Sequence, residues 1–313
     1  MRDSFVRTLT ELAAADPSVM LVTGDLGFGV LTKFAHRFPR QYLNAGVAEQ
    51  NMTAIAVGLA LEGRNVFTYS IGNFPTLRCL EQIRNDACYH QAKVRIVCIG
   101  GGFAYGSLGI SHHATEDLAI MRALPGMTVF APGDPWETEA ATDAAYRTAG
   151  TCYLRLGRGG EKNVHSERPH LEGGRILRLA HGRDVTLLST GGILAVANEA
   201  RSQLVEMGID AGLGSVPTLS PFDEDFIHEE LKERRQLIAT IEEHSVVGGL
   251  GGTVAEFLAE TANRGTRLLR CGLNRQFSST VGDQDFLREK YGLSAPKIAA
   301  AVVAAMRRGS KDS

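Results

Sequence analysis

One carboxylate, Glu49, precedes a stretch of sequence that is almost entirely apolar. Between residues 52 and 61 only Thr53 carries a polar side chain, and a helix that is apolar on every side is normally buried in a larger core. With Asn44 as the N-cap, Glu49 lies in the first turn of this helix, at the mouth of the core. The helix dipole favours a carboxylate there, whereas the loss of water disfavours its charged form. The position indicates a functional acid, with an acidic residue that only complements the dipole as the alternative.

Two adjacent histidines, His112 and His113, form a second group that can do chemistry. They lie in a polar loop that follows the glycine-rich residues 100–102, and sites on open sheets collect where strands end. An imidazole gains and loses protons near neutral pH, which suits general acid–base work. A histidine in a loop is also commonly a solvated residue, so the pair alone leaves both interpretations open.

The bulk composition is that of an ordinary globular chain and excludes several classes of protein. The 313 residues carry a net charge of −2 without a block of Lys or Arg, which argues against a nucleic-acid or anionic-membrane partner. No signal-peptide core or membrane-spanning run is present, so we expect a cytoplasmic protein. The cysteines are odd in number and have no C-x-x-C spacing, which predicts reduced, mostly buried thiols and no zinc site. They are Cys79, Cys88, Cys98, Cys152 and Cys271.

Short apolar runs alternate with helical patterns along the chain, which predicts an α/β fold with mostly parallel sheets covered by helices. In the first half, the runs predicted to be buried strands are residues 19–23, 65–69, 94–99, 128–131 and 151–156. The helical stretches there are residues 4–15, 47–61, 77–91, 114–123 and 135–149. The last of these has a good start signal, because Asp134 is a suitable cap and Pro135 suits the first turn.

A polar, glycine-punctuated stretch over residues 159–174 indicates a connection between domains. A second alternating unit follows it, with strands at residues 185–189, 210–216, 237–241 and 266–271 and helices at residues 194–207, 252–262 and 296–306. The chain is long enough for two cores, since single cores stop growing at roughly 250–300 residues. We therefore predict two α/β domains in series, residues 1–165 and 175–313.

Several motifs, in the same order along the chain, resemble those of the transketolase-like enzymes, which use thiamine diphosphate. The motifs similar to the pyrimidine-binding domain of that family are residues 34–39, 44, 46–52 (GVAEQNM), 111–119 (SHHATEDLA), 122–127 and 129–134. Those similar to the smaller transketolase C-terminal domain are residues 239–245 and 248–251. The resemblance covers nearly the whole chain and implies a parallel-sheet pyrimidine-binding domain followed by an α/β C-terminal domain.

One part of the family pattern does not occur. Full-length members carry a Gly-Asp-Gly motif and a later Asn that hold Mg²⁺ and diphosphate, and the Gly-Asp-Leu-Gly at residues 24–27 is not such a motif. The resemblance therefore implies the C-terminal subunit of a split transketolase, inactive alone. It further implies an N-terminal subunit that carries the Gly-Asp-Gly motif and binds Mg²⁺, in an α2β2 heterotetramer.

The resemblance assigns several residues to thiamine diphosphate. Glu49 matches the glutamate that hydrogen-bonds the pyrimidine ring nitrogen and drives the ring toward its imino form. Phe74 is our choice for the aromatic platform of the pyrimidine and Tyr69 is the second candidate, with core packing as the alternative for both. Asp25 resembles an acidic residue near the cofactor and the dimer interface, and can equally cap a turn.

Substrate contacts are implied for a histidine and for two arginines. His112, or its neighbour His113, matches a catalytic histidine that contacts substrate hydroxyls and helps move protons. Arg155 matches an arginine that grips a sugar phosphate, and Arg158 can do the same; a surface ion pair is the alternative for either.

Two departures from the family pattern concern the substrate. A phosphate-binding His near residues 100–101 and an Asp near residue 108 are absent, so we expect a substrate other than a simple pentose phosphate. Residues 101–107 would line the altered pocket. Glu243 and His244 end a strand in the second domain, and we expect structural or interface roles for them.

The favoured function is transfer of a two-carbon glycolaldehyde unit from a ketose to an aldose, in carbohydrate metabolism. The β subunit of a 2-oxo acid or acetoin dehydrogenase is a close rival, because the resemblance implies the same fold and glutamate. A non-catalytic interaction subunit is a further alternative, which loss of Glu49 would have supported.

Overall fold

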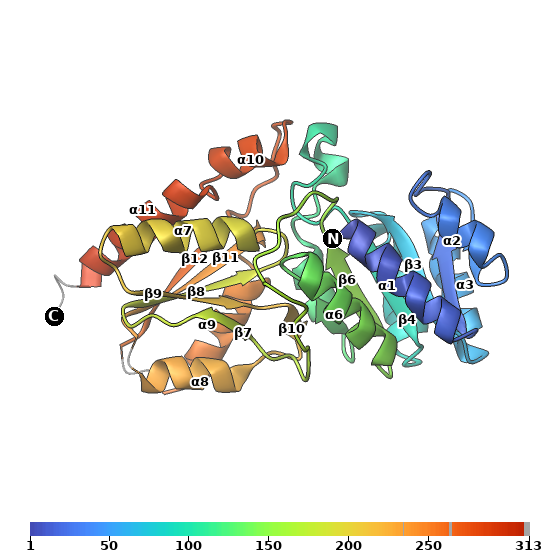
Figure 1. The fold of residues 1–313 in the computed structure, drawn as a ribbon, viewed down its shortest axis with the longest axis horizontal. Coiled ribbons are helices and arrows are strands. Elements are labelled where there is room, and N and C mark those ends of the chain that lie inside the picture. Colours follow the sequence, from blue (N-terminus) through green and yellow to red (C-terminus); the bar gives the residue numbers. More distant parts are fainter. Residues whose placement is uncertain (234, 263–264, 310–313) are drawn as a thin grey trace.

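The chain folds into two β-sheets that lie side by side, each with helices on both faces (Figure 1). The computed structural model describes residues 1–233, 235–262 and 265–309. The first sheet is built mainly from the N-terminal half of the chain and the second from the C-terminal half. The predicted α/β class, with two domains in series, is confirmed.

The first sheet has seven strands in the order β10-β5-β6-β4-β3-β1-β2, and all pair in parallel except β10. The strands are β1 (Val19–Thr23), β2 (Tyr42–Asn44), β3 (Asn65–Ile71), β4 (Val94–Ile99), β5 (Thr128–Phe130), β6 (Cys152–Leu156) and β10 (Thr218–Ser220). Five of these lie where apolar runs predicted them, because strands covered on both faces are apolar throughout. The two that were missed, β2 and β10, have three residues each and form no apolar run of recognisable length.

Helices pack on both faces of the first sheet. On one face α1 (Arg2–Ala15) and α6 (Pro135–Arg147) lie against each other (Figure 1), and on the other lie α3 (Glu49–Leu61) and α5 (Asp117–Arg122). The short α2 (Thr32–Arg37) follows β1. Helix α6 begins as predicted, with the Asp134 side chain accepting a hydrogen bond from the Glu137 amide.

The stretch predicted as one helix over residues 77–91 is irregular in the structure. It consists of a 3₁₀ turn (Leu77–Cys79), one α-helical turn α4 (Leu80–Gln82) and a π-helix (Ile83–Cys88). A π-helix within a helical segment often marks a functional position. The apolar periodicity predicted a helical segment but could not distinguish these backbone forms.

The second sheet has five strands in the order β12-β11-β8-β9-β7, with β7 antiparallel at one edge. The strands are β7 (Leu177–Ala180), β8 (Val185–Thr190), β9 (Ala211–Ser215), β11 (Leu237–Ser245) and β12 (Arg267–Leu273). The helices are α7 (Leu194–Glu206), α8 (Glu224–Lys232), α9 (Leu250–Glu260), α10 (Gln284–Lys290) and α11 (Ala295–Gly309). Helices α7 and α11 cover one face of this sheet, and α8 and α9 cover the other.

Helix α3 departs from the prediction in two respects. Its N-cap is Ala48 rather than Asn44, because Asn44 ends strand β2 and its side chain bonds the loop after β1. The helix is also not buried on every side: Val47, just before it, is 76% exposed and Leu61 at its end is 60% exposed. In a single chain, therefore, one apolar face of α3 meets solvent.

The two halves of the molecule are joined by strand pairing and by buried polar groups. Strand β10 lies beyond the boundary predicted between residues 165 and 175, yet it pairs with β5 of the first sheet.

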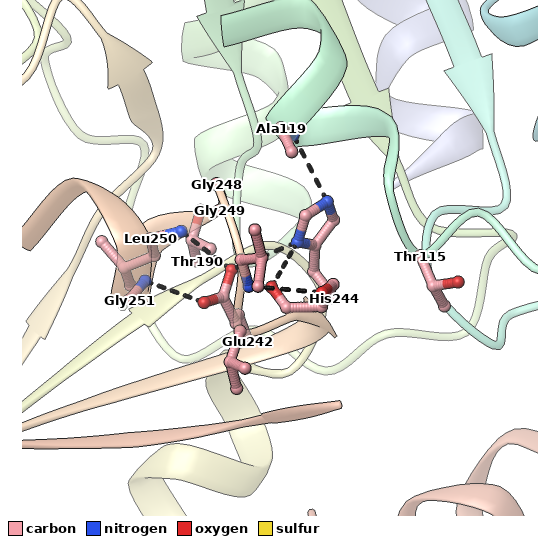
Figure 2. A network of polar contacts seen from close by, with 12 residues as sticks. Thr115, Ala119, Thr190, Glu242, His244, Gly248, Gly249, Leu250 and Gly251 are labelled. Atoms are coloured by element: carbon pink, nitrogen blue, oxygen red, sulfur yellow. Dashed lines mark hydrogen bonds and ion pairs between the residues drawn. The ribbon is translucent and has the colours of Figure 1, made fainter. Parts of the chain in front are cut away.

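Figure 2 shows the end of β11, where Glu242 accepts hydrogen bonds from the Leu250 and Gly251 amides at the start of α9. Burial raises the pKa of Glu242, although the nearby His244 and these two amides favour its charged form.

His244 reaches across to the first domain. Its Nε2 lies 3.4 Å from the amide nitrogen of Ala119 in α5 (Figure 2). The Ser245 amide donates to the carbonyl of Thr115 at 2.8 Å. These contacts place His244 at the interface between the two domains, in the kind of role that we expected for it.

The connection predicted over residues 159–174 is anchored to the start of α6 by a buried polar cluster. Asp134 Oδ2 accepts from the amides of Val164 and His165 and lies 3.0 Å from His165 Nδ1. Glu137 lies 3.5 Å from the same imidazole nitrogen and accepts from the Gly133 amide. Burial raises the pKa of Glu137 to about 7. Burial opposes the charge of His165, but its hydrogen bond to Asp134 and the nearby Glu137 raise its pKa overall.

This cluster predicts that the folded protein loses stability as the pH rises from about 4.5 to 7. In that range folded Glu137 keeps a proton that the unfolded chain has released. The raised pKa of His165 acts in the same direction, but only as the pH rises above about 6.5. In Glu137→Gln this pH-dependent loss of stability should be smaller by up to about 3 kcal/mol, since each unit by which the folded pKa exceeds the unfolded one contributes about 1.4 kcal/mol. Urea unfolding at pH 5 and pH 8 measures the difference. The exposed Glu172→Gln serves as control, and an unchanged pH slope in Glu137→Gln would contradict the prediction.

Candidate functional site

Six side chains cross the carboxyl ends of the strands in the first sheet, and each contacts the next. Sites on open parallel sheets form at this edge because the loops that follow the strands converge there. We call this group the candidate strip; its members in order of contact are Glu49, Arg78, Phe74, His112, Tyr105 and Arg158. The strip brings together four single residues that the sequence pointed to, Tyr105 from the segment 101–107 that was expected to line the pocket, and Arg78, which was not expected.

Glu49 is the first residue of α3 and its side chain is only 3% exposed. Gly24 follows β1 directly beneath it, and a Cβ atom at Gly24 would lie 3.4 Å from Glu49 Cγ. On the solvent side, Arg78 Nη1 donates to Glu49 Oε2 at 2.7 Å. The carboxyl group is thus enclosed by backbone and by one arginine, in surroundings where a hydrogen bond is stronger than in water.

Phe74 lies in the turn after β3 and presents a half-buried ring to its neighbours. The guanidinium carbon of Arg78 lies 4.6 Å from the ring centroid, and the His112 ring lies edge-on at 5.2 Å. Tyr69, the second candidate for the aromatic platform, is a core residue instead. It is buried and stacked on Phe5 of α1 at 6.1 Å.

Arg78 was missed by sequence reasoning. It lies in a stretch with a helical pattern, where an arginine is ordinarily a solvated surface residue. The one local signal is that it follows Phe74 by four residues. Its pairing with Glu49 depends on two segments that the sheet brings together, so no local pattern could reveal it.

The structure distinguishes the two adjacent histidines. His112 is half-buried, bonds Ser111 Oγ through Nδ1 at 3.0 Å and faces both Phe74 and Tyr105. Burial and the neighbouring His113 lower the pKa of His112, so its imidazole is mainly neutral at neutral pH. His113 is fully buried, with Nε2 3.1 Å from the Gly106 carbonyl oxygen and its ring against Phe103. His112 therefore lies in the strip, and His113 holds the loop that carries it.

Tyr105 and Arg158 form the far end of the strip. The Arg158 guanidinium carbon lies 5.4 Å from the centroid of the Tyr105 ring, and the arginine is exposed. Gly100 makes this arrangement possible: it has φ 93°, and a Cβ atom there would lie 2.2 Å from Tyr105 Cδ2. Burial raises the pKa of Tyr105, partly offset by Arg158, so the hydroxyl is neutral and can donate.

Arg155, expected to grip a phosphate, is committed within the protein. Its side chain is 4% exposed; Nε donates to Asp117 Oδ2 at 2.8 Å, and Nη2 donates to the carbonyls of Ala114 and Glu243. Glu243 belongs to the second domain, so Arg155 ties the two domains together. The geometry argues against a phosphate contact by Arg155.

Asp25 lies at the rim of this edge of the sheet rather than in the strip. It is exposed, has φ 57°, and exchanges hydrogen bonds with the Asn44 side chain at 3.0 and 2.8 Å. This pair fixes the loop between β1 and α2, which is the turn-forming alternative considered for Asp25.

Neither a cluster of metal-ligating side chains nor a membrane-spanning helix occurs in the part of the chain that the structure describes. Within those residues, no group of three or more His, Cys, Asp or Glu side chains could hold a metal ion. None of the helices described combines the length and apolar character needed to cross a membrane.

Comparison with known proteins identifies both parts of the chain. The family model for the transketolase pyrimidine-binding domain matches residues 1–160, and that for the transketolase C-terminal domain matches residues 174–298. One subunit of the apulose-4-phosphate transketolase of Phocaeicola vulgatus is 36% identical over 83% of this chain and 83% of that protein. The SqwH subunit of the 6-deoxy-6-sulfo-D-fructose transketolase of Clostridium sp. is 35% identical over 95% of this chain and 92% of that protein.

A solved structure shows the same fold over the whole chain. It is a split-gene transketolase in an inactive β4 tetramer, with TM-score 0.88 and 37% identity over 98% of this chain and 97% of that one. The structural similarity covers both domains, and each domain is matched by one of the two family models. The chain belongs to the transketolase family.

Proposed function

We propose that this chain is the C-terminal subunit of a thiamine diphosphate-dependent transketolase, which transfers a two-carbon ketol unit from a ketose to an aldose. The observation that carries the proposal is the buried carboxyl group of Glu49 beside the half-buried ring of Phe74 and the imidazole of His112. Family membership implies dependence on thiamine diphosphate and an enzyme of the transferase type.

The residues present fit the aminopyrimidine end of thiamine diphosphate. Glu49 offers a carboxyl oxygen shielded from water, and Phe74 offers a ring, which together suit a flat heteroaromatic group with a basic nitrogen. When bound, thiamine diphosphate supplies a thiazolium carbon acid that becomes the nucleophile of ketol transfer. Glu49 would hold a proton at the pyrimidine ring nitrogen, and Phe74 would fix the plane of the ring.

His112 and Arg158 would act on the sugar. His112 is mainly neutral, so its imidazole can accept a proton from a sugar hydroxyl and return it. The planar guanidinium of Arg158 suits an anionic group at the far end of the substrate. Because the family's second phosphate-binding His and its hydroxyl-binding Asp are absent, we expect an acceptor that is unphosphorylated or that belongs to a specialised carbohydrate pathway.

A companion subunit would complete the site. It would carry the Gly-Asp-Gly motif, hold Mg²⁺ and the diphosphate, and assemble with this chain as α2β2. The solvent-exposed apolar face of α3 supports an interface there, since soluble proteins seldom leave large apolar patches uncovered. Relatives named as transketolase subunits, and a solved relative that is inactive as a β4 tetramer, also support dependence on a partner.

Reconstitution tests the proposal. Mixed with its companion, Mg²⁺ and thiamine diphosphate, the chain should transfer a two-carbon unit from a ketose to an aldose, and neither chain should do so alone. Mass measurement of the complex should give two copies of each chain. Release of CO₂ from a 2-oxo acid without ketol transfer would favour the dehydrogenase β subunit. Cofactor binding without turnover of either donor class would favour the non-catalytic alternative.

His112 and His113 should respond differently to substitution. His112→Ala should lower kcat/KM for the ketose about 10²-fold, because it removes a proton-transfer group without disturbing a buried contact. His113→Gln should mainly lower the melting temperature, because it disturbs the bond to the Gly106 carbonyl. Steady-state kinetics and calorimetry measure the two effects, with the exposed His170→Ala as control. Larger activity loss in His113→Gln than in His112→Ala would reverse the assignment.

A further inference from the structure

One arginine, Arg78, already makes both contacts that the proposed cofactor ring requires. Its Nη1 donates to Glu49 Oε2 at 2.7 Å, and its guanidinium carbon lies 4.6 Å from the centroid of the Phe74 ring. The Arg78 side chain is 47% exposed and that of Glu49 is 3% exposed, so the arginine covers the carboxylate from the solvent side. The planar guanidinium of Arg78 thus contacts the Glu49 carboxylate and the Phe74 ring at the same time.

We propose that Arg78 is an internal competitor of the cofactor pyrimidine and must leave Glu49 and Phe74 before thiamine diphosphate binds. This inference rests on the proposed function, because it takes Glu49 and Phe74 to be the pyrimidine contacts. A guanidinium and an aminopyrimidine are both planar and both present nitrogen atoms to a carboxylate and a face to an aromatic ring. They make the same contacts, so they exclude each other.

The competitor has a physical function in the empty subunit. A buried carboxylate without a partner is costly, and the Arg78 guanidinium neutralises Glu49 while the site waits for its ligand. Release of Arg78 is also easy, because its side chain is half-exposed and can extend into water. The residue lies in the 3₁₀ turn Leu77–Cys79, so a small change in this irregular segment can move it.

Competition of this kind lowers the apparent affinity for the cofactor. The apparent Kd equals the intrinsic Kd divided by the fraction of molecules in which the site is open. Arg78→Ala should therefore tighten thiamine diphosphate binding about 3- to 10-fold and speed its association. Arg78→Lys should give a smaller gain, because an ammonium group can pair with Glu49 but cannot lie flat on Phe74.

The experiment uses the complex of this chain with its companion subunit. Titration calorimetry with thiamine diphosphate and Mg²⁺ gives Kd, and stopped-flow fluorescence gives the association rate. Arg84→Ala is the matched control, because Arg84 is an exposed arginine of the same segment whose Nη1 bonds the neighbouring Asn85 side chain. Arg78→Ala should bind the cofactor more tightly than the wild type, whereas Arg84→Ala should not differ. Unchanged or weaker binding by Arg78→Ala would overturn the inference, the latter by making Arg78 a cofactor contact.

Thermal unfolding of the isolated subunit keeps the test informative if Arg78→Ala folds poorly. The empty Arg78→Ala subunit should melt below the wild type, and Arg78→Lys should restore most of the difference. Equal melting temperatures for all three would contradict the neutralising function of Arg78. Failure of the proposed function is distinguishable, because the wild-type complex would then bind no thiamine diphosphate or would bind it with no effect of Glu49→Gln.

Discussion

Replacing Glu49 by glutamine is expected to lower the kcat of the reconstituted enzyme by about 10²- to 10⁴-fold. Glutamine has nearly the same shape and can still accept a hydrogen bond from Arg78, but it has no acidic proton to hold at the pyrimidine ring nitrogen. The loss should appear in kcat rather than in folding, because the side chain stays enclosed between Gly24 and Arg78. Steady-state kinetics with the ketose and aldose pair measure this effect.

The control for this prediction lies on the same helix. Glu62 is the exposed C-terminal cap of α3, so Glu62→Gln removes a carboxylate without touching the strip and should leave kcat unchanged. Circular dichroism and the melting temperature should be the same for Glu49→Gln and the wild type. A Glu49→Gln enzyme with kcat within threefold of the wild type would remove the main support for thiamine diphosphate chemistry at this site.

Removing the carboxylate of Asp117 is expected to destabilise the protein by about 3–5 kcal/mol, the usual cost of breaking a buried ion pair from one side. Asp117 is buried, and its Oδ2 accepts from Arg155 Nε at 2.8 Å and from the Tyr153 hydroxyl at 2.6 Å. Burial opposes the charge of Arg155, but Asp117 and its other neighbours raise its pKa, so the guanidinium stays charged. Asp117→Ala leaves that cation buried without its counter-charge.

This effect is measured by urea unfolding and calorimetry on the isolated subunit. The surface pair of Arg183 and Asp210 provides the control, because Arg183→Ala breaks an exposed contact that water replaces. Combining Asp117→Leu with Arg155→Met should recover part of the stability lost in Asp117→Ala, since no charge then remains buried. Equal stability for Asp117→Ala and Arg183→Ala would show that the pair of Asp117 and Arg155 contributes little to the stability of the domain interface.

Much of the fold followed from local patterns in the sequence. Strand β4 (Val94–Ile99) lies at the predicted residues, because a strand covered on both faces needs an unbroken apolar run. The start of α6 at Pro135 was also predictable, because Asp134 caps the first turn through its own side chain. The position of Glu49 in the first turn of α3 came from the same kind of evidence, although the expected cap Asn44 belongs to a strand instead.

The sequence by itself determined which apolar segments are buried, the order of the α/β units and the position of an acidic residue at the start of an apolar helix. Only the tertiary structure decided that Tyr69 lies in the core and Phe74 in the strip, because Tyr69 is within β3 and packs against α1, whereas Phe74 lies in the turn beyond the end of that strand. It also decided that Arg155 pairs with Asp117 and Arg78 with Glu49. The apolar periodicity of a segment predicts only which of its own residues are buried. The partner of a buried charge comes from another segment, distant in the sequence, that the fold brings beside it.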